Sequence, residues 1–306
     1  MVALKKITEE IFDDVFEKYL VDDDPYLGKE DWLRLFTLSP NQDEDYSGYA
    51  LIDGNDIVGM LGMFFSKRSI KSQTQRFCNL HSWFVDEEYR SHSLSLMRPA
   101  IKLKDHTLTD FTPTDKVCDI SKKLGFKEVD ARVKILSPFS SSKGKSSLNV
   151  LENPIDIASR LSDVDARLLQ DHQSDTFGSL LLEDKGEYCY VIFTQVERHI
   201  VPYSYIHYIS NKSMFEQYEQ AIKRHLTKNS KSKYVAVNSR LVQGLNLPWS
   251  FTLPVSTTQL FRSKDLSPTD IDSLYTEVSL LKLATYPSIK HSIKKIVMNP
   301  YKTLIG

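Results

Sequence analysis

The segment from Phe84 to Ser95 has the residue types that could hold an anion. An apolar, strand-like run ends at Val85, and after an acidic turn the chain continues with Tyr-Arg and a series of small residues. An apolar helical pattern follows. A strand that enters a helix through small residues leaves several backbone N–H groups pointing outward at the positive end of the helix. The sequence therefore predicts a pocket for a phosphate or diphosphate at this turn.

This turn resembles the coenzyme A-binding turn of the GNAT superfamily of N-acetyltransferases, whose signature is Arg/Gln-x-x-Gly-x-Gly/Ala. Here Arg90 is followed by Ser93 and Ser95 at the two glycine positions. The run Lys123-Leu124-Gly125-Phe126 is also similar to the Lys-Leu-Gly-Phe end of the helix that packs near the coenzyme thiol in that family. The likeness covers roughly residues 46–136 and reaches the second half of the chain only in outline.

The resemblance implies a site for acetyl-CoA, or another acyl-CoA, as co-substrate. Phe84 and Val85 would lie beside the pantetheine arm. The phosphate cradle would be formed by Arg90, Ser91, His92, Ser93, Leu94 and Ser95. Serine meets a steric penalty in the left-handed conformation that glycine allows, yet it keeps its N–H and adds a hydroxyl donor. Binding therefore stays open, and Pro99 should make the following helix start late or kink.

His81 is the candidate base. It lies four residues before Val85, where some members of the resembled family place a glutamate that receives the proton of the amine. A group with a pKa near seven suits this task, because attack on a thioester needs a neutral amine. Alternation along a strand would put His81, Trp83 and Val85 on one face. The alternative is a structural histidine packed beside Trp83.

Ser121 stands where many members of that family carry a tyrosine that protonates the departing thiolate. A serine hydroxyl is a far poorer proton donor, so the general acid stays unassigned. The first functional hypothesis is acyl-CoA-dependent N-acyltransfer, most simply of an acetyl group to an amine of a small metabolite or sugar. The second is a GNAT fold that has lost catalysis and serves as a binding or assembly module. A third, weaker one places the site in the second half, near residues 209–213.

The composition is typical of a globular protein and argues against several partners. Lys and Arg number 39 against 40 acidic residues, so no overall charge favours nucleic acid. The three cysteines have no CxxC spacing, so we expect neither a metal site nor a disulfide framework. No apolar window approaches about eighteen residues, and the first residues lack the apolar core of a signal peptide. We expect a cytoplasmic protein without a membrane span, in an oligomeric state that the sequence leaves open.

The order of the expected elements repeats along the chain. Residues 46–111 read as hairpin, strand, helix and strand, and the same order returns in residues 177–237. This repetition predicts an α/β protein of two GNAT-like units, each a mixed, mostly antiparallel sheet flanked by helices, with a degenerate second unit. The Ser-rich segment 138–150 is the expected linker, which gives an acyl-CoA-binding domain at 1–137 and a second domain at 151–306.

Single helices can also be placed. Apolar residues at helical spacing predict helices at 9–20, 94–104 and 115–124, the last ending at Gly125 as its C-cap. The pattern from Ile271 to Leu281 predicts another.

Overall fold

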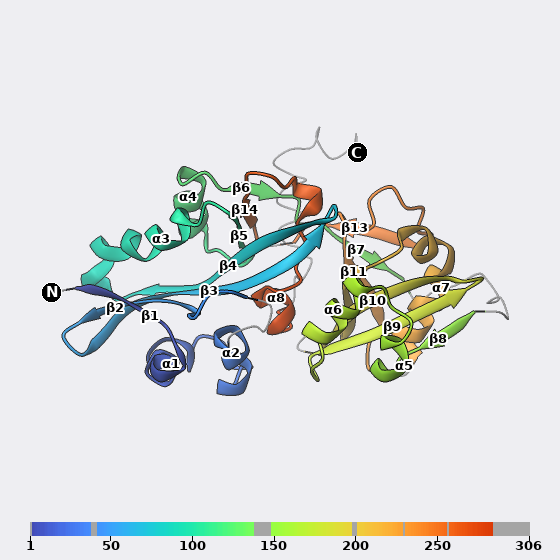
Figure 1. Cartoon of the computed structure of the whole chain (residues 1–306), viewed down its shortest axis with the longest axis horizontal. Helices are drawn as coiled ribbons and strands as arrows, with labels where there is room; N and C mark the ends of the chain where they lie inside the picture. Colours follow the sequence, from blue (N-terminus) through green and yellow to red (C-terminus); the bar gives the residue numbers. More distant parts are fainter. Residues whose placement is uncertain are drawn as a thin grey trace. The chain divides into compact units, whose positions relative to one another are not determined.

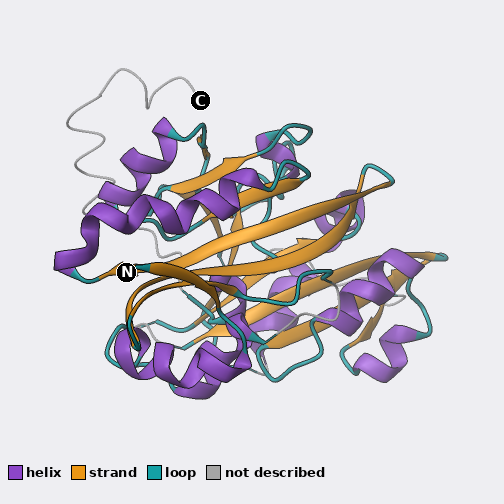
Figure 2. Ribbon diagram, turned by 60° about the vertical axis from the view of Figure 1, so that its left-hand side comes forward, coloured by secondary structure: helices purple, strands orange, loops and turns teal. Residues whose placement is uncertain are grey.

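The computed structural model describes residues 2–37, 42–137, 148–197, 201–228, 230–255 and 257–283. The chain divides into two compact units. The first contains Met1–Val129 together with Thr258–Leu283, and the second contains Asp130–Thr257. Figure 1 labels their elements, and Figure 2 shows the same chain coloured by secondary structure.

The first unit is built on one sheet of seven strands in the order β1-β2-β3-β4-β5-β14-β6. These strands are β1 (Ala3–Lys6), β2 (Gly48–Asp53), β3 (Asp56–Ile70), β4 (Gln73–Val85), β5 (His106–Asp110), β6 (Lys127–Val129) and β14 (Gln259–Arg262). Its α-helices are α1 (Glu9–Val15), α2 (Lys29–Phe36), α3 (Ser93–Lys102), α4 (Asp115–Lys123) and α8 (Glu277–Leu280). A π-helix at Phe16–Leu20 and 3₁₀-helices at Glu87–His92 and Pro268–Asp270 complete it.

Helices cover both faces of this first sheet. Figure 1 shows α1 and α2 on one side of the strands and α3 and α4 on the other. Leu96 and Met97 of α3 and Cys118 of α4 are buried in one core cluster with residues of β3 and β4. The helix predicted at 115–124 is found as α4, and Gly125 at its end has a φ of +90°. At its start, the Thr114 hydroxyl accepts a hydrogen bond from the Val117 amide at 3.3 Å. This contact gives a hydrogen-bond acceptor to a free amide at the helix start, and the left-handed glycine lets the chain leave the helix at its end.

The second unit also has a sheet of seven strands, in the order β13-β7-β12-β11-β10-β9-β8. The strands are β7 (Val133–Leu136), β8 (Asn149–Leu151), β9 (Phe177–Asp184), β10 (Glu187–Val196), β11 (Tyr203–Ile209), β12 (Tyr234–Asn238) and β13 (Ser250–Leu253). The helices are α5 (Pro154–Ala158), α6 (Asp163–Asp171) and α7 (Lys212–Lys228).

The two sheets have matching arrangements, which confirms the predicted tandem of α/β units. In each, a single parallel pair, β4 with β5 or β11 with β12, is flanked by antiparallel neighbours. The place beyond that pair is filled by β14 in the first sheet and by β7 in the second. Strand β7 directly follows β6 in the chain, whereas β14 comes after the second unit. Each sheet therefore takes one strand from the half of the sequence that otherwise builds the other sheet.

The division of the chain differs from the predicted domains because of this exchange. The segment just before the expected linker contributes β6 to the first sheet and β7 to the second. The first unit ends at Val129 and regains the chain at Thr258–Leu283. Of the expected linker, residues 138–147 lie outside the described residues, and Asn149–Leu151 pairs with β9 as β8.

The prediction of a long helix from Ile271 to Leu281 is wrong. Only α8, Glu277–Leu280, is helical there. The Asp272 carboxylate accepts a hydrogen bond from the Leu274 amide at 3.0 Å, and Tyr275 has a φ of +56°. A local side-chain turn of this kind competes with helix formation. The apolar residues of this segment are nevertheless buried, because it packs against the first unit without regular secondary structure outside α8.

Candidate functional site

Strand β4 continues past the end of its parallel neighbour. It pairs with β5 only from Arg76 to Asn79, although it runs to Val85. On its other edge, the Asp86 amide donates to the Val58 carbonyl at 3.0 Å. Because amides alternate between the two edges of a strand, the amide of Val85 faces the edge that β5 has left. A backbone donor is thus available where the sheet opens.

A β-bulge interrupts β4 just before this opening. Gly62 pairs with His81 and Met60 pairs with Phe84, so Leu61 alone faces Ser82 and Trp83. Ser82 takes up the extra length in a left-handed conformation, with a φ of +50°. A bulge changes which face the following side chains occupy.

The expectation that His81, Trp83 and Val85 share one face is therefore wrong. The His81 ring contacts Phe36 of α2, with ring centroids 5.2 Å apart. Trp83 and Val85 pack instead against the cluster that contains the buried side chains of α3. Phe84 is on the α1 side, where it stacks on Tyr19 with centroids 5.7 Å apart. His81 and Val85 consequently face different spaces.

A groove of about 550 Å³ lies on the α3 and α4 side of β4. Its lining comes from the end of β4, the following turn and α4: Trp83, Val85, Arg90, Ser93, Leu94, Thr114, Lys116, Val117, Ile120, Lys123 and Leu124. Every charged side chain among these residues is cationic. Such a lining suits an anionic ligand.

Four residues of the predicted coenzyme site line this groove, namely Val85, Arg90, Ser93 and Leu94. Ser91, His92 and Ser95 lie on the same turn and helix but are not among the lining residues, and Phe84 lines a different cavity.

The turn itself is helical rather than an open loop. Ser93 has a right-handed conformation, with φ −52° and ψ −44°, so serine meets no steric penalty at this glycine position. Its amide, however, donates to the Arg90 carbonyl within the 3₁₀-helix. The turn therefore offers fewer free backbone donors than the sequence predicted, and the side chains that suit an anion in this groove are Arg90, Lys116 and Lys123. Helix α3 begins at Ser93 and runs through Pro99 without ending there.

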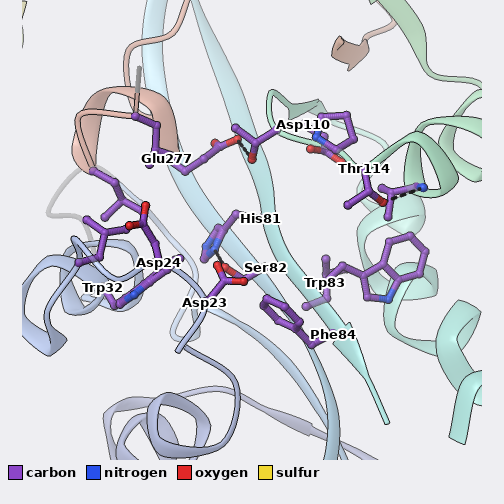
Figure 3. A pocket seen from close by; sticks show the side chains of 17 residues that line it. Asp23, Asp24, Trp32, His81, Ser82, Trp83, Phe84, Asp110, Thr114 and Glu277 are labelled. Carbon is purple, nitrogen blue, oxygen red and sulfur yellow. Dashed lines mark hydrogen bonds between the residues drawn. The ribbon is translucent and has the colours of Figure 1, made fainter. Parts of the chain in front are cut away.

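A separate cavity of about 310 Å³ lies beside His81 (Figure 3). Its charged lining residues are all acidic: Asp23, Asp24, Asp110 and Glu277. Trp32, His81, Ser82, Trp83 and Phe84 contribute aromatic and polar surface. The cavity therefore has the opposite electrostatic character to the groove.

His81 is held firmly but keeps one ring nitrogen unpaired. The side chain is 5% exposed, and its Nδ1 lies 3.1 Å from the Ser82 hydroxyl. Nε2 is buried without a hydrogen-bond partner, and burial lowers the pKa of the ring to about 3. Buried polar atoms usually have a partner. A neutral imidazole with a free nitrogen at a cavity is therefore available to a ligand.

Two buried carboxylates line the same cavity and were not predicted from the sequence. Glu277 is 2% exposed and accepts hydrogen bonds from the Asn79 amide at 2.5 Å and the Thr112 hydroxyl at 2.9 Å. Asp110 is 6% exposed. Burial, followed by the charge of Glu277, raises the pKa of Asp110 well above its usual value. Burial likewise raises the pKa of Glu277.

The position of Asp110 at the end of a predicted strand was the one local signal for this pair. Glu277 gave none, because its partner Asn79 is 198 positions away in the sequence.

The groove and the cavity share part of their walls. Trp83, Thr114 and Val117 line both. Trp83 is at the bulge of β4, and Thr114 and Val117 form the first turn of α4. Two ligands, one in each space, would therefore meet at the point where β4 and β5 separate.

Ser121 is not part of either lining. Its side chain is fully buried on the inner side of α4, and its hydroxyl has no hydrogen-bond partner. In the second unit, the N-terminus of α7 is closed by its own cap, since the Met214 amide donates to the Asn211 side chain at 3.0 Å and the Phe215 amide to the Asn211 carbonyl at 2.9 Å. The amides near residues 209–213 are thus largely used within the protein.

Within the described ranges, no His, Cys, Asp and Glu side chains gather in a way that could hold a metal ion. The same part of the chain contains no helix with the length and hydropathy needed to cross a membrane.

Comparison with known proteins identifies the fold. Three solved structures superpose on most of this chain. A GCN5-related N-acetyltransferase from Anabaena variabilis matches with a TM-score of 0.58 and 15% identity, covering 86% of this chain and 72% of its own. One from Kribbella flavida matches with a TM-score of 0.57 and 15% identity, covering 86% and 71%. A protein of Enterococcus faecalis described as a probable N-acyltransferase matches with a TM-score of 0.57 and 11% identity, covering 88% of this chain and 74% of its own.

Sequence comparison adds no relative to these. No protein-family model matches the chain, and no curated protein matches it significantly. The structural likeness extends over both units, so the chain has the GNAT fold in tandem.

Proposed function

We propose that this chain, which has the fold of the GCN5-related N-acetyltransferases, is an acyl-CoA-dependent N-acyltransferase that acts through its first unit. One observation carries the proposal. The groove has only cationic charged side chains, the adjoining cavity has only acidic ones, and the two share a wall at the bulge of β4. A coenzyme with a diphosphate suits the first space, and a protonated amine suits the second.

In the groove, Arg90, Lys116 and Lys123 would face the phosphates of the coenzyme. The acyl end would then lie toward Trp83, with the Val85 amide at the open edge of β4 as the donor that polarises the acyl carbonyl. Acetyl is the simplest acyl group for this role, and a small-molecule amine in the cytoplasm is the simplest acceptor.

In the cavity, the amine must lose a proton before it attacks. We assign His81 Nε2 to accept a hydrogen bond from the amine and orient it, because a ring with a pKa of about 3 is neutral at pH 7. The proton passes to Asp110 or Glu277, whose raised pKa values bring them closer to a useful base.

The amine nitrogen then forms a bond to the acyl carbon, and the bond from that carbon to sulfur breaks. As the amide forms, the nitrogen gives its second proton to solvent, and the coenzyme leaves as a thiolate that takes a proton from solvent. A thiol has a pKa near 8.5, so its anion can leave without a strong general acid. The position of Ser121 away from both spaces is compatible with this course.

A catalytically inactive module is the second candidate, and one observation favours it. The Ser93 amide is already bonded to the Arg90 carbonyl, which removes one donor from the phosphate site. This candidate predicts no binding of any acyl-CoA at the first unit.

Binding of acetyl-CoA to the whole chain decides between the two. Thermal or urea unfolding with free coenzyme at about a hundred times its Kd should show about 2.7 kcal/mol of added stability. Ser93→Glu should weaken binding at least tenfold, because repulsion of about 1 kcal/mol from each of two nearby phosphates exceeds the roughly 1.4 kcal/mol that a tenfold loss requires. Acetyl-CoA should then be consumed in the presence of simple amines.

Ser91→Glu is the matched control, since Ser91 is exposed on the same turn and outside the groove lining. It should leave the coenzyme affinity within about twofold of the wild type, because exposed charges interact weakly. Absence of any shift with acetyl-CoA or longer acyl-CoA would instead support the inactive module. Equal losses in both variants would show that the phosphates lie elsewhere.

A further inference from the structure

The acidic side chains of the cavity form two separate pairs. Asp110 and Glu277 are buried and come from the end of β5 and from α8. Asp23 and Asp24 come from the turn after the π-helix, where Asp23 is exposed and Asp24 half-buried. Figure 3 shows the ring of His81 between these two pairs. A ligand that passes His81 would therefore meet carboxyl groups on both sides.

Acidic clusters alone do not make a site, but His81 gives a second and independent indication. Its side chain lines the cavity, is 5% exposed and leaves Nε2 without a partner. If the Nδ1 proton is donated to the Ser82 hydroxyl 3.1 Å away, Nε2 presents a lone pair to the cavity. A lone pair is complementary to an ammonium N–H and not to an anion.

The remaining lining supports a cation of modest size. Trp32, Trp83 and Phe84 offer aromatic surface, and no lysine or arginine is among the described residues of the lining. Aromatic faces and carboxylates together favour ammonium groups. A volume of about 310 Å³ is at the small end of the range for ligand sites.

We propose that the acceptor is a small aliphatic diamine, whose reacting amine lies at His81 and whose second ammonium lies at Asp23. This inference rests on the proposed function for the identity of the reacting amine. An amino acid would place its carboxylate beside the acidic residues at one end of the cavity, so the same lining excludes it. Asp23 and Asp24 are neighbours in the sequence and both line the cavity, so a bound ammonium would offset the negative charge gathered there.

The test is equilibrium binding of three probes to the whole chain without coenzyme: 1,5-diaminopentane, pentylamine and 6-aminohexanoate. The diamine should bind about fivefold tighter than pentylamine at low salt, the upper range for one partly exposed charge pair. 6-Aminohexanoate should bind more weakly than pentylamine. Asp23→Asn should bring the diamine to within about twofold of pentylamine while leaving pentylamine unchanged.

Asp22→Asn is the control, because Asp22 is the preceding exposed acid and does not line the cavity. It should not change the preference for the diamine. Equal affinities for the diamine and pentylamine, or equal effects of the two substitutions, would overturn the proposal.

Acyl transfer then separates this proposal from the proposed function. Diamine-selective binding without transfer from any acyl-CoA would retain the cation site and reject the transferase. Transfer from acetyl-CoA to pentylamine and the diamine with the same kcat/KM would retain the transferase and reject the diamine acceptor.

Discussion

The ring of His81 lies directly against the α-carbon of Gly62, its partner on the neighbouring strand. A β-carbon at position 62 would be 2.1 Å from Cε1 of His81 and 2.6 Å from its unpaired Nε2. The absence of a side chain at Gly62 is thus what allows the ring to occupy its place at the cavity. Since the obstacle is a single ring rather than backbone, an added methyl group must move His81.

Gly62→Ala should therefore impair acyl transfer through His81 while sparing the coenzyme site. The overpacking should cost about 1–3 kcal/mol of folding stability. We expect kcat to fall at least tenfold, because misplaced proton-transfer groups lose much of their effect. The Kd for acetyl-CoA should stay within twofold, as Gly62 does not line the groove. Steady-state kinetics and calorimetric binding measure the two quantities.

Gly178→Ala is the matched control in the second unit. A β-carbon there would lie 2.2 Å from Cζ of Phe193, which is a clash of the same kind. It should reduce stability by a similar amount and leave kcat unchanged. A rate loss equal to that of Gly62→Ala would mean that general destabilisation, and not the position of His81, controls the rate.

Stability should fall in acid because two histidines are buried in the neutral form. Burial lowers the pKa of His81 to about 3, and burial with the charge of His172 does the same for His207. In the unfolded chain both have a pKa near 6.5, so the unfolded state binds more protons between pH 6.5 and 3. Each contribution is complete above pH 6.5 and is lost as the pH falls through this window.

The expected loss is about 2 kcal/mol per histidine between pH 6.5 and pH 5. Urea unfolding at several pH values measures it. His81→Gln and His207→Gln should each remove the contribution of one histidine to the pH dependence of the unfolding free energy, and the double variant should remove both contributions. A slope that is unchanged in His81→Gln would show that its ring is protonated in the folded protein.

Because β14 belongs to the first sheet and β7 to the second, a substitution in either strand should destabilise the unit that contains its sheet. Leu260 of β14 is fully buried in a core cluster of the first unit, and Leu136 of β7 is fully buried in one of the second. Each leucine-to-alanine change should cost about 2–5 kcal/mol. Leu260→Ala should speed amide hydrogen exchange in β5, and Leu136→Ala should speed it in β12, with little effect on the other unit. The reverse pattern would contradict the strand order.

Local features of the sequence predicted the fold and half of the site. The turn that begins after Val85 and the run ending at Gly125 are contiguous segments, so their residue types report directly on a strand-to-helix turn and a helix end. Val85, Arg90, Ser93 and Leu94 line one groove, so these four residues of the predicted coenzyme site are close together, and their role in binding stays a prediction.

Features that depend on distant pairing could not be predicted in this way. The bulge at Ser82 arises from the register of β4 against β3, and it reverses the face on which His81 was expected. Glu277 contacts Asn79 from 198 positions away, with the residues of the second unit lying between them in the sequence. Neither the register nor a contact over such a separation leaves a periodic pattern in one sequence.

Glu277→Gln should separate stability from catalysis. Because the pKa of Glu277 is raised in the folded protein, its contribution to stability is present at low pH and is lost as the pH rises through the folded value. Glutamine keeps the shape of the side chain without the buried charge. The free energy of unfolding of the variant, minus that of the wild type, should therefore be larger at pH 8 than at pH 4. With Glu277 as the proton acceptor, transfer should fall about 10²-fold or more, because an amide cannot take up the proton; with Asp110 as the acceptor the rate should change little.

Glu219→Gln provides the contrast, because the Glu219 carboxylate lies 2.6 Å from the Lys223 ammonium and both side chains are 1% exposed. Removing this charge should cost about 3–5 kcal/mol, since the buried ammonium loses its counter-charge. Denaturant unfolding and initial rates, measured for both variants, give the comparison. If Glu277→Gln also destabilised the protein at pH 8 and left the rate unchanged, Glu277 would be a structural residue and the proton would need another acceptor in the cavity.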